Sequence, residues 1–99
     1  MKINFGQALK TLEGEELKYG EKALALKVPA VNALMGAYED ERNLSGEEKV
    51  KRYDLAMRIT SITEPDLTAE ETALIKKLIA KAYSPLVVGQ AWKMLENKP

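Results

Sequence analysis

The chain has 99 residues, of which 45% are hydrophobic and 30% are charged, and its fifteen basic and fifteen acidic side chains cancel. This size and composition predict a single globular domain, residues 1–99, rather than a disordered chain. A neutral chain lacks the excess positive charge that drives binding to nucleic acid or to anionic membranes, so we expect neither as the main partner.

Residues with catalytic potential are scarce in the sequence. It contains no cysteine and no histidine, which excludes disulfides, thiolate nucleophiles, structural zinc sites and imidazole acid–base catalysis. No glycine-rich nucleotide motif and no G-x-S-x-G motif is present. A metal site would need carboxylates alone, and the acidic pairs Glu47–Glu48 and Glu70–Glu71 stand where helices are expected to begin. We therefore predict no catalytic, cofactor-binding or metal-binding residues, and a protein that is not an enzyme.

No apolar run has the length of a signal-peptide core or of a membrane-spanning helix. The sequence therefore predicts a cytoplasmic protein without membrane association.

The N-terminal part, residues 1–28, is expected to form a small β-hairpin or extended segment. Ile3 and Phe5 alternate on one face, Gly14 is a turn signal, and a second extended piece would follow around residues 16–19. The stretch GQALKTLEG could also begin as helix. Two isolated strands are marginal in water, so this segment needs support from the helical body at residues 29–96.

Apolar spacing in the rest of the chain predicts a mainly α fold, with about four helices packed around one core. The expected helices cover residues 29–39, 46–62, 69–83 and 85–96. Pro29 suits a helix first turn, and Ser84 followed by Pro85 is a typical helix start. Two further starts have the spacing of a capping box, Ser45 with Glu48 and Thr68 with Glu71.

The helix at 46–62 carries two adjoining apolar rows, Val50–Tyr53–Met57 and Leu55–Ile59–Ile62. So broad an apolar face predicts that more than one neighbouring element covers this helix. Three acid-to-base pairs with i,i+4 spacing are expected to stabilise it, Glu47–Lys51, Glu48–Arg52 and Asp54–Arg58.

The last helix holds the only tryptophan and an interior glycine. Gly89 costs roughly 1 kcal/mol relative to alanine inside a helix, which predicts a neighbour that approaches it closely. Under a structural interpretation, Gly89 admits the 69–83 helix and Trp92 closes the core. Under a functional interpretation, this face is a partner interface formed by Val88, Gly89, Trp92 and Leu95. Nothing in the stretch specifies a small ligand.

The basic cluster KVKRY and the following arginine give a second functional hypothesis, a small DNA-binding or transcription-regulating protein. Its nucleic-acid contacts would be Lys49, Lys51, Arg52 and Arg58. Acidic residues one turn earlier match these cations, which is typical of a solvated helix face.

The stretches MKINF, SGEEKVKRYDLAMRI and DLTAEETALIKKLIAKAYSPLVVGQAWKMLE resemble short, mostly uncharacterised proteins encoded by tailed bacteriophages and prophages. This resemblance covers most of the chain and implies a phage or prophage origin and expression in the bacterial cytoplasm. It implies no site residues. Combined with the missing catalytic chemistry, it predicts a non-enzymatic protein–protein interaction or assembly accessory protein. Its expected partner is another copy of itself, a phage protein or a host protein.

Overall fold

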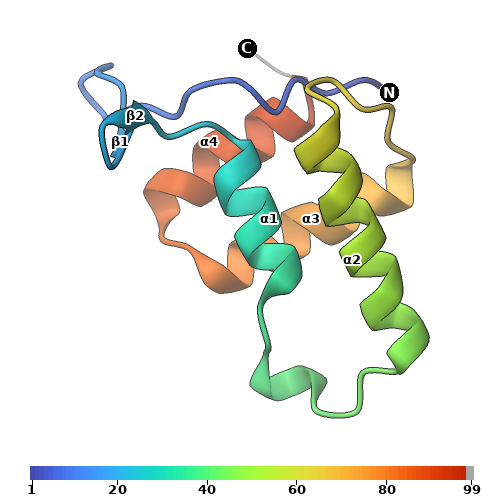
Figure 1. Cartoon of the computed structure of the whole chain (residues 1–99). Helices are drawn as coiled ribbons and strands as arrows, with labels where there is room; N and C mark the ends of the chain where they lie inside the picture. The colour runs from blue at the N-terminus through green and yellow to red at the C-terminus, as the bar shows by residue number, and fades with distance from the viewer. Residues whose placement is uncertain (98–99) are drawn as a thin grey trace.

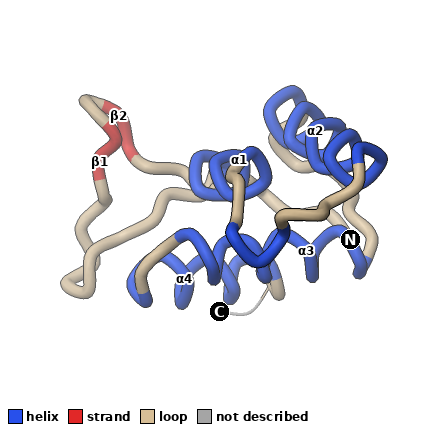
Figure 2. The backbone as a smooth tube through the Cα atoms, turned by 90° about the horizontal axis from the view of Figure 1, so that it is seen from below, coloured by secondary structure: helices blue, strands red, loops and turns tan. Residues whose placement is uncertain are grey.

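The computed structural model describes residues 1–97, except for the side chain of Tyr19, and its four helices confirm the predicted mainly α fold. The elements are β1 (Lys18–Tyr19), β2 (Lys22–Ala23), α1 (Lys27–Met35), a short 3₁₀ helix η1 (Glu39–Glu41), α2 (Gly46–Ser61), α3 (Ala69–Ala82) and α4 (Pro85–Leu95). The helices form two layers, α1 beside α2 over α3 beside α4 (Figure 2). α1 contacts both α2 and α3, and α3 contacts α4. α1 therefore joins the two layers, and α2 lies at the edge farthest from α4 (Figure 1).

One cluster of buried side chains forms the core, and it draws on every helix and on the N-terminal segment. Ile3 and Phe5 both belong to it, as their alternation predicts, and both are almost completely buried. The other members are Leu26, Ala30, Ala33, Leu34, Leu55, Ala56, Ile59, Leu67, Ile75, Leu78, Ile79, Ala91 and Leu95.

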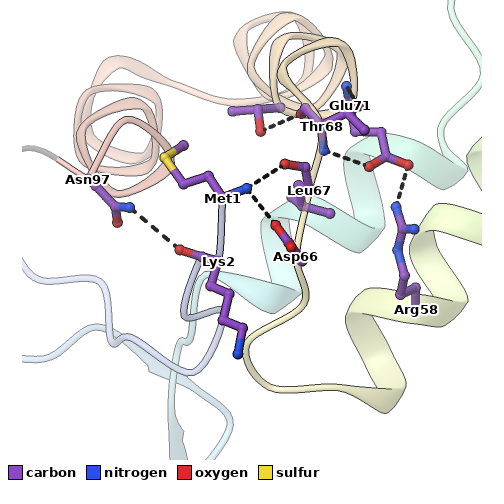
Figure 3. A network of polar contacts seen from close by, with 9 residues as sticks. Met1, Lys2, Arg58, Asp66, Leu67, Thr68, Glu71 and Asn97 are labelled. Atoms are coloured by element: carbon purple, nitrogen blue, oxygen red, sulfur yellow. Dashed lines mark hydrogen bonds and ion pairs between the residues drawn. The ribbon is translucent and has the colours of Figure 1, made fainter.

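Local capping signals place the starts of α2, α3 and α4 where the sequence predicts them. At α3 the capping box is complete, since Thr68 Oγ1 accepts from the Glu71 N–H (3.1 Å) and Glu71 Oε1 accepts from the Thr68 N–H (2.9 Å) (Figure 3). At α2 only half of the box forms, because Ser45 accepts from the Glu48 N–H while the Glu48 carboxylate lies 3.7 Å from the guanidinium of Arg52. At α4, Pro85 begins the helix without a capping bond from the Ser84 side chain.

α1 departs from its predicted span of 29–39 at both ends. It begins at Lys27, so that Pro29 still lies in the first turn, and it ends at Met35. Gly36 is extended (φ −72°, ψ 154°), and Tyr38 folds back so that its hydroxyl donates to the Ala33 carbonyl at 2.6 Å. The same carbonyl accepts from the Gly36 N–H at 3.3 Å, so both bonds cap the end of α1, four residues earlier than predicted.

The first residues of the chain pair with the connection between α2 and α3, about sixty residues away. The Ile3 N–H donates to Pro65 O (3.3 Å), and the Phe5 N–H donates to Thr63 O (2.9 Å). The ammonium group of Met1 donates to Asp66 (2.5 Å) and to the Leu67 carbonyl (3.0 Å) (Figure 3). Nothing in the local sequence pattern predicts this partner.

The β-hairpin lies one turn later than predicted. Gly14 does occupy a turn, with φ +94°, and an isolated bridge joins Lys10 to Glu16 across it. The strands, however, flank Gly20 (φ +68°), with Lys18 opposite Ala23 in an antiparallel register. The stretch GQALKTLEG is not helical.

Candidate functional site: an apolar stripe on α2

The α4 face that the sequence suggests as a partner surface belongs largely to the core. Leu95 is completely buried, and Val88 is partly buried against the core cluster. Leu95 therefore cannot contact a partner, and that part of the prediction is wrong.

Trp92 fastens α4 to α3. Its indole Nε1 donates to the Lys76 carbonyl at 3.0 Å, and the Lys76 ammonium lies 4.6 Å from the centroid of its ring. Lys76 also forms an ion pair with Glu96, the residue that follows α4. The side chain is 37% exposed, but both its polar atom and one ring face are already engaged within the chain. Trp92 thus acts mainly as a contact between two helices.

Gly89 has no close neighbour. A Cβ built at this position would meet nothing within 4 Å, and the residue is exposed. The predicted close approach of another helix is therefore wrong. A closer neighbour is found at Gly36, whose added Cβ would lie 2.9 Å from the hydroxyl oxygen of Tyr38.

The four cations proposed for nucleic acid do not form one basic surface. Arg52 is only 5% exposed and is held by Glu41 through two 2.8 Å hydrogen bonds. Arg58 forms an ion pair with Glu71 (Figure 3). Lys49 and Lys51 are exposed, but residues two apart on a helix project about 200° from each other. The structure thus leaves two lysines on different sides of α2 and neutralises both arginines.

The Arg52–Glu41 pair attaches the connection between α1 and α2 to the inner face of α2. The guanidinium group, through its hydrogen bonds, lowers the pKa of Glu41 to about 2, against the opposing effect of burial. Hydrogen bonding to Glu41 likewise raises the pKa of Arg52. Both groups stay charged over the whole physiological range, so the pair is a fixed structural link.

Lys81 extends this link to α3. Its ammonium lies 2.8 Å from Asp40 and 3.5 Å from Glu41, and 5.3 Å from the ring centroid of Tyr38. The hydrogen bond that the Lys81 ammonium donates to Asp40 is the main reason that the pKa of Lys81 is raised. The η1 segment is therefore held from two helices at once, which fixes the surface next to the first turns of α2.

The outer face of α2 carries three large apolar side chains that the rest of the described chain leaves about half exposed. Val50 is 57% exposed, Tyr53 is 55% exposed and Met57 is 49% exposed. Their spacing of three and four residues places them on one side of the helix. We call these three residues the α2 stripe.

The sequence predicts that both apolar rows of α2 are covered. Leu55 and Ile59 of the other row are buried, but its third residue, Ile62, is 49% exposed. For the stripe and for Ile62 that prediction is wrong.

The α2 stripe continues into a hollow between the end of α1 and the first turns of α2. Met35, which is 49% exposed, and Tyr53 both line this hollow, which has a volume of about 460 Å³. Lys49 and Arg42 also line it. An aromatic ring and two methionines on one surface are typical of protein interfaces, and methionine adapts its shape to a partner easily.

No protein-family model, no curated protein sequence and no solved structure matches this chain. Within residues 1–97, no three acidic side chains come together in an arrangement that could hold a metal ion. Among the same residues, no helix is both long enough and apolar enough to cross a membrane.

Proposed function

We propose that this protein works by binding another protein, without catalysing a reaction, and that the α2 stripe is the binding surface. The exposure of Val50, Tyr53 and Met57 carries the proposal, since each leaves about half of its side chain in water. Burying such side chains contributes roughly 25 cal/mol for each Å² of apolar surface removed from water. Scattered single apolar residues need no explanation, but three on one helix face form a patch.

The rigid support beneath the stripe favours binding. Arg52 and Glu41 fix the inner face of α2 next to Tyr53, so a partner meets a surface that is already ordered. A preformed surface loses less conformational entropy on binding than a mobile one. The resemblance to phage and prophage proteins supports the role of an accessory or assembly protein in the cytoplasm of a bacterial host.

Pull-down experiments from bacterial lysate test the proposal. The baits are the native chain, the double variant Tyr53→Gln/Met57→Gln, and Leu12→Gln as the matched control. Leu12 is 90% exposed and lies beside α4, so its replacement removes apolar surface elsewhere without changing the charge. We expect the native and control baits to retain a protein, another copy included, that the double variant loses. Identical sets of retained proteins on all three baits would contradict the proposal.

A further inference from the structure

We infer that the partner which covers the α2 stripe is a second copy of this chain, bound so that the two α2 helices lie parallel about a twofold axis. This inference rests on the proposed function, because it names the occupant of that same surface. Its grounds are the spacing of the stripe, the charges on its two edges and the position of α2 in the fold.

The spacing of the stripe is that of a coiled-coil seam. Val50 and Met57 are seven residues apart, and Tyr53 lies between them at three and four residues. In heptad terms Val50 and Met57 occupy a positions and Tyr53 occupies a d position.

The charges on the two edges of the stripe select a second copy and its orientation. Glu47 and Asp54 occupy the e edge, whereas Lys49 occupies the g edge. Two parallel helices bring the g edge of each against the e edge of the other, so that Lys49 of one copy faces Asp54 of the other, twice. Antiparallel helices would instead place one acidic edge against the other. The chain is therefore complementary to itself in the parallel orientation alone.

These edge charges are free to pair across an interface. Within residues 1–97, neither Glu47, Lys49 nor Asp54 takes part in an ion pair, although all three are exposed. The sequence suggests the i,i+4 partners Lys51 for Glu47 and Arg58 for Asp54, but neither ion pair forms in the described part of the chain. Arg58 forms its ion pair with Glu71 instead. A second copy would supply the missing partner on each edge.

The position and size of α2 determine how tightly the two copies are expected to bind. The helix lies at the edge of the molecule, on the side away from α4 (Figures 1 and 2). Its sixteen residues make it about 24 Å long. A seam of this length buries less than the roughly 800 Å² per partner of a standard stable interface, so the dimer is weak. We expect a dissociation constant of roughly 10–1000 µM.

Sedimentation equilibrium across 10 µM to 1 mM protein tests the self-association. The native chain and Leu12→Gln should both shift from monomer towards dimer over this range, whereas Tyr53→Gln/Met57→Gln should remain monomeric. Circular dichroism and urea unfolding check that the double variant is folded, which its exposed positions predict. A native chain that stays monomeric at 1 mM would overturn the inference.

A charge-exchange cycle tests the orientation. Lys49→Glu should raise the dissociation constant about tenfold, because two attractive pairs become two repulsive ones. Asp54→Lys should have a similar effect, and the double variant Lys49→Glu/Asp54→Lys should return to within about threefold of the native value. Equal weakening in the single and double variants would contradict the parallel pairing. High salt should reduce all of these differences, because exposed charges are screened.

Disulfide trapping gives a direct geometric readout, because the chain has no cysteine of its own. In a parallel seam the two copies of position 50 face each other within the separation that a disulfide requires, about 4.4–6.8 Å between Cα atoms. Val50→Cys should therefore give a covalent dimer under mild oxidation, in contrast to Leu12→Cys at equal concentration. In an antiparallel seam an a position faces a d position instead, so position 53 would link to position 57 in a mixture of Tyr53→Cys and Met57→Cys chains. Preferential formation of that mixed dimer would overturn the parallel arrangement.

Failure of this inference is distinguishable from failure of the proposed function. A monomeric native chain that still retains a different protein through the α2 stripe would reject self-association and leave the binding role intact. A monomeric chain whose three baits retain identical proteins would reject both.

Discussion

α2 and α4 differ in what they do with their apolar rows. α4 directs Ala91 and Leu95 into the core, and it fastens its tryptophan to the backbone of α3. α2 buries Leu55 and Ile59 but leaves Val50, Tyr53 and Met57 in water. The difference arises because α4 packs its apolar residues against α3, whereas α2 has more apolar surface than its main helical neighbour, α1, covers. An aromatic residue by itself therefore does not mark an interaction surface. Whether neighbouring elements cover it determines whether it is available to a partner.

The largest expected effect is the loss of the buried ion pair that fixes α2. Arg52→Met removes both hydrogen bonds to the buried Glu41 carboxylate and leaves it only the Lys81 ammonium at 3.5 Å, and we expect a loss of about 3 kcal/mol in the free energy of unfolding. Urea unfolding measures it. Lys51→Met, at an exposed position of the same helix, should change stability by less than about 0.5 kcal/mol. The double variant Glu41→Gln/Arg52→Met should be more stable than Arg52→Met alone; equal stabilities would show that charge burial is not the cause.

The same pair predicts how stability responds to acid. The pKa of Glu41 is about 2 in the folded chain against an ordinary value of 4.5, so the folded state binds fewer protons in this range. The stability that the ionised Glu41 contributes to the fold is complete above pH 4.5 and is lost as the pH falls towards 2. It amounts to roughly 3 kcal/mol. Urea unfolding at a series of pH values should show a steeper decline for the native chain than for Glu41→Gln. Parallel curves would contradict this assignment.

Alanine substitutions at two glycines are expected to change the stability in opposite directions. The first, Gly36, lies in the connection that leads to α2. An alanine there would place its Cβ 2.9 Å from the Tyr38 hydroxyl oxygen and displace the bond to Ala33. We expect a loss of about 1–2 kcal/mol in the free energy of unfolding. In a Tyr38→Ala background the same substitution should cost little; an undiminished cost there would place the strain elsewhere.

The second glycine, Gly89, lies in α4 and should respond with the opposite sign. Nothing lies within 4 Å of an added Cβ, so Gly89→Ala gains helix propensity without a clash. We expect an increase of up to about 1 kcal/mol in the free energy of unfolding, or a few degrees in Tm. Calorimetry measures it. A decrease would mean that α4 approaches another element more closely than its surroundings in the fold indicate.

Local signals in the sequence predict the starts of three helices, because capping depends on residues three positions apart. Thr68 with Glu71, Ser45 and Pro85 all stand where the pattern places them. The early end of α1 escapes prediction because it depends on Tyr38 folding back onto Ala33, and the apolar spacing continues past it. The resemblance to phage proteins and the roles that it implies remain predictions.

The site is harder to predict than the fold, for a physical reason. Periodicity shows which residues share a helix face, but it does not show which face meets a neighbour. Val50, Tyr53 and Met57 therefore look like core residues in the sequence. Similarly, the matched spacing around Arg52 suggests a solvated cation, whereas its main partner is Glu41, eleven residues earlier. A signal in the sequence was available: α2 has two apolar rows, and a small four-helix fold offers few elements to cover both of them.

The pairing of the first five residues with the connection at 63–67 has a consequence for the order of folding. Ile3 and Phe5 are core residues, yet their backbone partners are Pro65 and Thr63. On a ribosome, Ile3 and Phe5 must therefore wait until α1, α2 and the connection that follows them have been synthesised. Closing so long a loop is slow relative to forming local helical turns. We expect α2 and α3 to form first and the N-terminal segment to close the core last.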